Sequence, residues 1–170
     1  MDTADFRKRL ASWDHPLGPF REPEDISEEM QQAALELGAS AARGLADLAV
    51  AIDRERSPLG GVFIDFIEYY ARSFPEALAE ALLERLTSNG PPLVVFALGS
   101  TGSATASRHL LSTLDLNSAD DDLLEALAST LGELGDSHSI EALRALRNRP
   151  GLSDRILNEI NAALWDADNQ

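Results

Sequence analysis

The segment that decides the fold reads Leu131-Gly132-Glu133-Leu134-Gly135-Asp136. Glycine tolerates a positive φ and a close approach between helices, and an aspartate that follows it can cap a second helix. Apolar residues then recur at helical spacing, at Ile140, Leu143 and Leu146. The segment therefore predicts two helices that are joined by a tight turn and packed against each other.

A weaker copy of this segment lies 33 residues earlier in the chain. The residues that keep one register are Leu98, Gly99 and Gly102 in the first copy and Leu131, Gly132 and Gly135 in the second. A period of this size, built from two amphipathic helices, is typical of an α-solenoid, in which each repeat buries its apolar face against the next. The sequence thus predicts an all-α fold, a short right-handed α-solenoid of about four helix pairs with capping helices.

Residues 91–165 resemble HEAT-like repeats of the phycobilisome-lyase type, in which a Leu-Gly-x-x-Gly-Asp turn joins the paired helices. The residues that carry the resemblance are Leu131, Gly132, Leu134, Gly135, Asp136, Ile140 and Leu143. The copy at 98–113 departs from the pattern, with Thr101 at a leucine position and Ser103 in place of the aspartate. The resemblance implies an α-solenoid but no particular activity, because such repeats occur in chromophore lyases, scaffold subunits, regulators and toxin-neutralising proteins.

The remainder of the chain also reads as helices that proline and glycine separate. The expected helices cover residues 3–13, 27–37, 39–56, 58–73, 75–88, 91–98, 103–114, 120–134, 137–147 and 153–165. No segment has the alternation of a strand, and the densest apolar and aromatic cluster runs from Val62 to Tyr70.

We expect these helices to form a single HEAT-like repeat domain over residues 1–170. Within it, an N-terminal helix and a proline-rich loop (1–26) precede degenerate repeats (27–90). The clearer repeats and a C-terminal cap follow (91–165).

Net charge is the outlier of the composition, because 29 acidic residues face 14 basic ones and leave −15 at neutral pH. Such a surface repels nucleic acid and anionic membranes and favours a basic protein partner. The chain has no cysteine, which excludes disulfides, thiolate metal sites and cysteine nucleophiles. Bases at positions 7–9 are not followed by the apolar run of a secretory signal, and no stretch is long enough to span a membrane, so we expect a cytoplasmic protein of bacterial type.

No motif predicts an enzyme, a cofactor or a metal site. The run Gly99–Ser103 lacks the lysine of a phosphate-binding loop, and His15, His109 and His138 do not have metal-ligand spacing. The three aspartates from Asp120 lack a calcium-loop pattern, and no Gly-x-Ser-x-Gly elbow is present. We therefore expect a protein without catalytic activity, although acid pairs for glycoside chemistry remain open.

The acidic residues gather in rows. No lysine or arginine lies between Arg108 and Arg144, an interval that holds eight acids. The candidate partner-binding residues are Glu76, Glu80 and Glu84 on one expected helix and Asp120, Asp121 and Asp122 at the start of another. Two interpretations stand: a solvated acidic face, with the aspartates as a helix cap, or a docking surface for a basic protein. If the acids only confer solubility, the next candidates are Tyr69, Trp165 and the 16–23 loop.

These features favour a non-enzymatic acidic protein-binding module. Its most specific form is an immunity-type inhibitor that masks a cationic bacterial toxin domain. The alternatives are a lyase-like or enzyme-accessory HEAT protein and an adaptor subunit of a larger regulatory complex. The sequence leaves the oligomeric state open.

Overall fold

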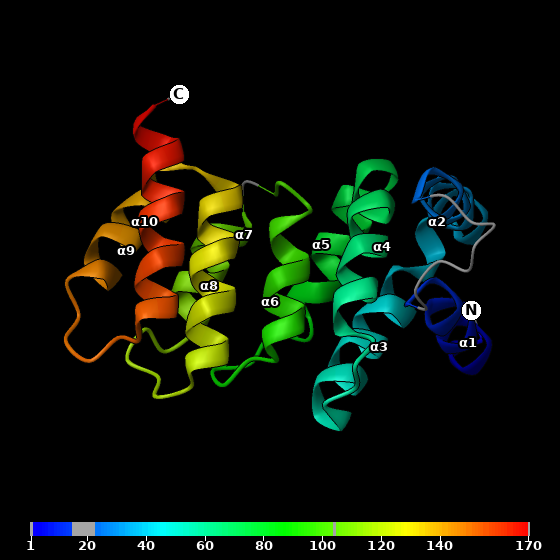
Figure 1. The fold of residues 1–170 in the computed structure, drawn as a ribbon, viewed down its shortest axis with the longest axis horizontal. Helices are drawn as coiled ribbons and strands as arrows, with labels where there is room; N and C mark the ends of the chain where they lie inside the picture. The colour runs from blue at the N-terminus through cyan, green and yellow to red at the C-terminus, as the bar shows by residue number, and fades with distance from the viewer. Residues whose placement is uncertain (1, 15–22, 104, 170) are drawn as a thin grey trace.

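The structure, a computed structural model, describes residues 2–14, 23–103 and 105–169, and these ranges contain ten α-helices, one 3-10 turn and no strand (Figure 1). The elements are α1 (Thr3–Asp14), α2 (Pro23–Leu37), the 3-10 turn η1 (Ala39–Ala41), α3 (Ala42–Glu55), α4 (Gly60–Ser73), α5 (Pro75–Leu83), α6 (Pro92–Gly99), α7 (Ala106–Thr113), α8 (Asp121–Leu134), α9 (Ser137–Arg147) and α10 (Asp154–Asp168). The all-helical prediction is confirmed. None of the helices in these ranges combines the length and apolar character needed to cross a lipid bilayer.

Helix ends differ from the prediction at three places. Helix α2 begins at Pro23 and not near Ser27, because proline is well tolerated in a first helical turn. Gly38, with φ of 64°, is followed by a 3-10 turn before α3 starts. Helix α5 ends at Leu83, because the next amides bond to carbonyls three residues back and tighten the chain.

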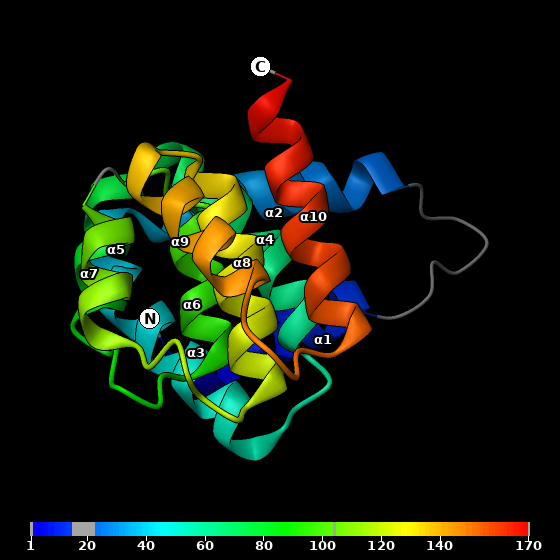
Figure 2. The same cartoon turned by 90° about the vertical axis from the view of Figure 1, so that its left-hand side faces the viewer.

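The helices lie in two rows that follow chain order. Helices α4, α6, α8 and α10 pack side by side in one row, and α3, α5, α7 and α9 pack in the other. Figures 1 and 2 show the first row in front of the second, with α1 and α2 at the end next to α4. Each helix of the first row packs on helices of the second, so the apolar core runs between the rows.

The 33-residue register of the sequence is also a register of backbone geometry. Gly102 and Gly135 both have φ of 59°, so both turns use the left-handed conformation that was expected. Gly99 lies on the backbone of α8, and a Cβ atom added to Gly132 would lie 2.6 Å from the Cβ atom of Ala163 on α10. The glycines therefore serve the predicted turns and close approaches. Asp136 caps α9 as predicted, since its Oδ1 accepts a hydrogen bond from the Ser139 amide at 2.9 Å.

The aromatic cluster predicted around Val62–Tyr70 fixes the N-terminal end of the molecule. Phe66 of α4 packs against Phe6 and Trp13 of α1, with ring centroids 4.9 and 5.7 Å apart. The hydroxyl group of Tyr70 donates a hydrogen bond to the Gly38 carbonyl at 2.7 Å. These contacts hold α1 and α2 on α4, whereas smaller aliphatic side chains fill the core between α6 and α10.

Candidate functional site

A groove follows the exposed side of α6, because α6 packs against both α4 and α8 and forms the floor between them. At the N-terminal ends of these helices is a hollow of about 600 Å³, here called the N-terminal hollow. Its lining residues are Ile52, Asp53, Arg56, Ser57, Gly60, Pro92, Leu93, Phe96, Asp120, Asp122 and Glu125. A smaller hollow, the C-terminal hollow, is lined by Glu68, Arg72, Ser100 and Glu133. Phe96 and Ser100 are one helical turn apart on α6, so the two hollows are successive parts of one α6 groove.

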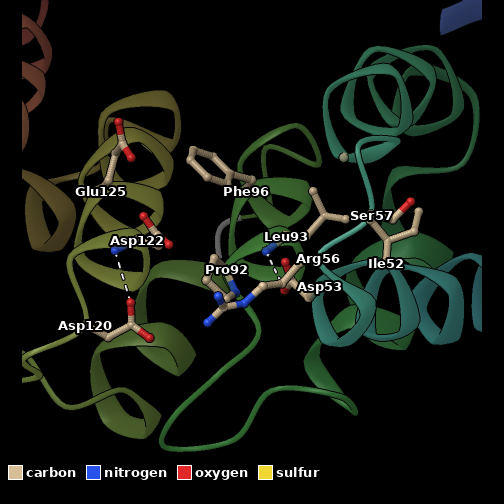
Figure 3. Close-up of a pocket in the computed structure, with 11 residues that line it drawn as sticks. Ile52, Asp53, Arg56, Ser57, Pro92, Leu93, Phe96, Asp120, Asp122 and Glu125 are labelled. Carbon is tan, nitrogen blue, oxygen red and sulfur yellow. Dashed lines mark hydrogen bonds between the residues drawn. The ribbon is translucent and has the colours of Figure 1, made fainter.

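Two carboxylates of the N-terminal hollow cap helices (Figure 3). Asp53 of α3 accepts a hydrogen bond from the Leu93 amide at 2.9 Å, the first amide of α6 available after two prolines. Asp120 accepts hydrogen bonds from the amides of Asp122 and Leu123 at 3.0 and 3.2 Å. The capping interpretation of the aspartate run is thus confirmed for Asp120.

The loop before α8 is held from behind by one arginine. The Arg149 guanidinium donates hydrogen bonds to the carbonyls of Leu116, Asn117 and Ser118 at 2.9, 3.3 and 2.8 Å. Three bonds from one side chain give this loop a defined course. Arg149 therefore helps to position Asp120 at the edge of the hollow.

Two arginines are close to the acids of the N-terminal hollow. Arg155 of α10 bridges Asp122 and Glu125 at 2.9 and 3.0 Å. Arg56 adopts the left-handed conformation, with φ of 49°, where the chain leaves α3. Its side chain lines the hollow and forms no ion pair or side-chain hydrogen bond with the residues that the structure describes. The charge of this hollow is therefore partly balanced.

The C-terminal hollow is balanced less well. A Cβ atom at Gly99 would collide with the carboxylate of Glu133, so this carboxylate lies directly over the end of α6. Within the described ranges, Glu133 has neither a hydrogen bond nor an ion pair. Arg72 is 4.0 Å from Glu68, at the outer limit of an ion pair. Glu133 also lies in the last turn of α8, where the helix dipole is unfavourable for an acid.

Several groove carboxyls have raised pKa values. Burial raises the pKa of Asp53 despite the hydrogen bond from Leu93, and the charges of Asp120 and Asp122 add to the rise. Burial also raises the pKa of Glu133, together with the charges of Glu68 and Glu159. Asp65, one turn before Glu68 on α4, has a pKa that burial raises as well. A cation placed in the groove would stabilise all these carboxylates.

The six predicted partner-binding acids lie in two different places. Asp120 and Asp122 line the N-terminal hollow, and Asp121 is exposed beside them on the first turn of α8. Glu76, Glu80 and Glu84 belong to α5 or directly follow it, in the other row of helices. Glu80 lines a separate hollow beside Arg43, and Glu84 is 3.4 Å from Arg43. The structure thus brings together half of the predicted set and separates it from the other half.

Sequence reasoning missed the groove itself. It did not single out Asp53, Phe96 or the pairing of α4 with α8. One signal was present: 33 residues after Phe96 the chain has Ser129, and 33 further on it has Ala162. An aromatic residue at a position where the later copies have small side chains indicates an additional apolar surface that the repeat itself does not require.

The remaining candidates have plain structural places. Gly99–Ser103 forms the turn between α6 and α7, where the Thr101 hydroxyl bonds to the Leu98 carbonyl at 2.7 Å. Tyr69 is half-buried under the Arg72 guanidinium, whereas Trp165 is 69% exposed. His15 and residues 16–22 of the predicted loop lie outside the described residues. No group of three or more histidines and acids in the described part of the chain is arranged to hold a metal ion.

No protein-family model, curated protein or solved structure matches this chain. Its function therefore has to be inferred from the groove and from the charge of the surface around it.

Proposed function

We propose that the chain is a non-enzymatic protein-binding module that captures a basic protein in the α6 groove. One observation supports this above all: carboxylates from α3, α4 and α8 gather around the half-buried Phe96, and the cations near them do not balance them all. Charge of one sign in a concave, partly apolar surface steers a partner of opposite charge and accelerates association. In its most specific form the protein is a bacterial, cytoplasmic immunity-type inhibitor that masks a cationic toxin domain.

The fold that we propose for this module is a short right-handed α-solenoid of the HEAT-like type. The order of the helix contacts supports it, because α4, α6, α8 and α10 follow one another in one row and α3, α5, α7 and α9 in the other. The matched glycines of the two turns, 33 residues apart, support it too.

The test combines partner capture with a matched pair of variants. The partner is isolated from the native organism at low ionic strength and identified, and its binding kinetics are measured against the purified protein. The groove variant carries Glu125→Gln and Glu133→Gln on α8. The control carries Glu76→Gln and Glu80→Gln on α5, with the same change of charge in the other row.

We expect a basic partner, an association rate that falls steeply with salt, and a groove variant that associates several-fold more slowly while the control is unchanged. A basic toxin domain would identify an inhibitor, a chromophore protein a lyase-like accessory, and a large complex an adaptor subunit. If the control variant alone loses binding, the docking surface is the α5 row. A partner that is not basic, or binding that salt does not affect, would refute electrostatic docking.

A further inference from the structure

The two hollows of the α6 groove differ from a general acidic patch because they have a fixed spacing. Glu125 and Glu133 lie on one side of α8 eight residues apart, which is about 12 Å along the helix axis at 1.5 Å per residue. The first lines the N-terminal hollow and the second lines the C-terminal hollow. Two cations that fill both hollows at once must therefore be about 12 Å apart.

An apolar surface lies between these two carboxylates. Phe96 is half-buried on α6, and it occupies the register position of Ser129, midway between Glu125 and Glu133 on α8. Leu93 and Pro92 extend the apolar floor toward the N-terminal hollow. A ligand that crosses the groove lengthwise thus meets carboxylate, apolar floor and carboxylate in turn.

The width of the groove favours an extended chain over a helix. Neighbouring packed helices have axes roughly 8–10 Å apart, so the axes of α4 and α8, with α6 between them, are at most roughly 20 Å apart. The side chains of α4 and α8 occupy about half of that distance, which leaves less than the roughly 10–12 Å diameter of an α-helix. An extended backbone is narrower and fits this space.

We propose that the α6 groove binds an extended segment in which two arginine or lysine side chains flank an apolar one, in the order cation-x-apolar-x-cation. Alternate residues of an extended chain point to the same side, so all three side chains face the groove. Four residues of such a chain span about 13 Å, which matches the spacing of the two carboxylates. The apolar side chain packs on Phe96, one cation reaches Glu133, and the other reaches Asp53 and Glu125. This inference rests on the proposed function and specifies the partner sequence that the groove selects.

Two peptides of identical composition test the spacing against the full-length protein at low ionic strength. One contains Arg-Ser-Leu-Ser-Arg, which places all three large side chains on one face. The other contains Arg-Leu-Ser-Arg-Ser, which places the first arginine opposite the other two. Calorimetry or fluorescence anisotropy should give a roughly tenfold lower Kd for the first peptide, the equivalent of about one lost charge-assisted contact.

Variants show where the preference arises. Phe96→Ser introduces the side chain that the next repeat already has at this position, and it should remove most of the tenfold difference. Glu133→Gln should weaken the first peptide and leave the second nearly unchanged, while Glu76→Gln should affect neither. Circular dichroism and melting curves check that each variant is folded.

Equal affinities for the two peptides, or no binding of either, would overturn the spacing proposal. The capture of a basic partner is measured separately, so the proposed function would survive that result if the Glu125→Gln, Glu133→Gln variant still loses its partner. Peptide discrimination that Phe96→Ser leaves intact would place the binding site elsewhere and also overturn the proposal.

Discussion

The two ends of the α6 groove carry charges of the same sign but stabilise them to different degrees. At the N-terminal end, Asp120 caps α8 and Asp122 pairs with Arg155, so these acids contribute to folding. At the C-terminal end, Glu133 lies over α6 with no partner among the described residues and beside other carboxylates. The acidity of a surface therefore has no single meaning. One acid holds the structure, and another is tolerated at a small loss of stability that a cationic ligand would recover.

The largest effect should come from a change that leaves both ends of the groove intact. Leu143 of α9 is fully buried, and Leu143→Ala should lower the free energy of unfolding by roughly 2–5 kcal/mol, because the cavity cannot be filled by its neighbours. Urea denaturation measures the loss. The folded fraction should bind cationic peptides normally, and a variant as stable as the original protein would show that the packing of α9 has been misjudged.

Removal of the cap at the N-terminal end should have the next largest effect. Asp120→Ala leaves the first amides of α8 without their acceptor and should reduce stability by about 1 kcal/mol. Asp121→Ala, a neighbour that forms no cap, serves as the control. Equal melting temperatures for these two variants would contradict the structural role of Asp120.

A third change would make the N-terminal end resemble the C-terminal end. Arg155→Gln frees the carboxylates of Asp122 and Glu125, at a stability loss of at most about 1 kcal/mol because the pair is exposed. The freed acids should bind a cationic peptide roughly two- to threefold more tightly and make its affinity more sensitive to salt. Weaker binding would mean that Arg155 organises the groove and does not compete with the ligand.

The smallest effect has the opposite sign. Glu133→Gln should raise stability by roughly 0.5 kcal/mol or less, the range of exposed charge pairs. The pKa of Glu133 is above its usual 4.5 in the folded protein, so proton loss with rising pH destabilises the fold. The advantage of glutamine should therefore grow from about pH 4 to about pH 7 in melting experiments. A glutamine variant that is less stable at neutral pH would show that Glu133 supports the fold.

The sequence predicted those features that depend on neighbours in the chain. The turn glycines at 102 and 135, the cap by Asp136 and the spans of α8 and α9 follow from local rules of conformation and spacing. The groove depends on contacts between distant residues. Asp53 caps α6 across 40 positions of sequence, and Glu133 reaches Gly99 only because α8 packs on α6. No periodicity encodes which acid lies over which helix, so half of the predicted acids proved to be far from the groove.

The exposed Trp165 has a consequence for how such a protein can lengthen. It occupies on α10 the register position that glycine occupies on α6 and α8, where the next helix of the row comes closest. A duplicated repeat placed against α10 in the same way would meet an indole ring where the earlier copies leave room for a backbone. Growth of this row by gene duplication, or by a designer who appends repeats, therefore has to begin with Trp165→Gly.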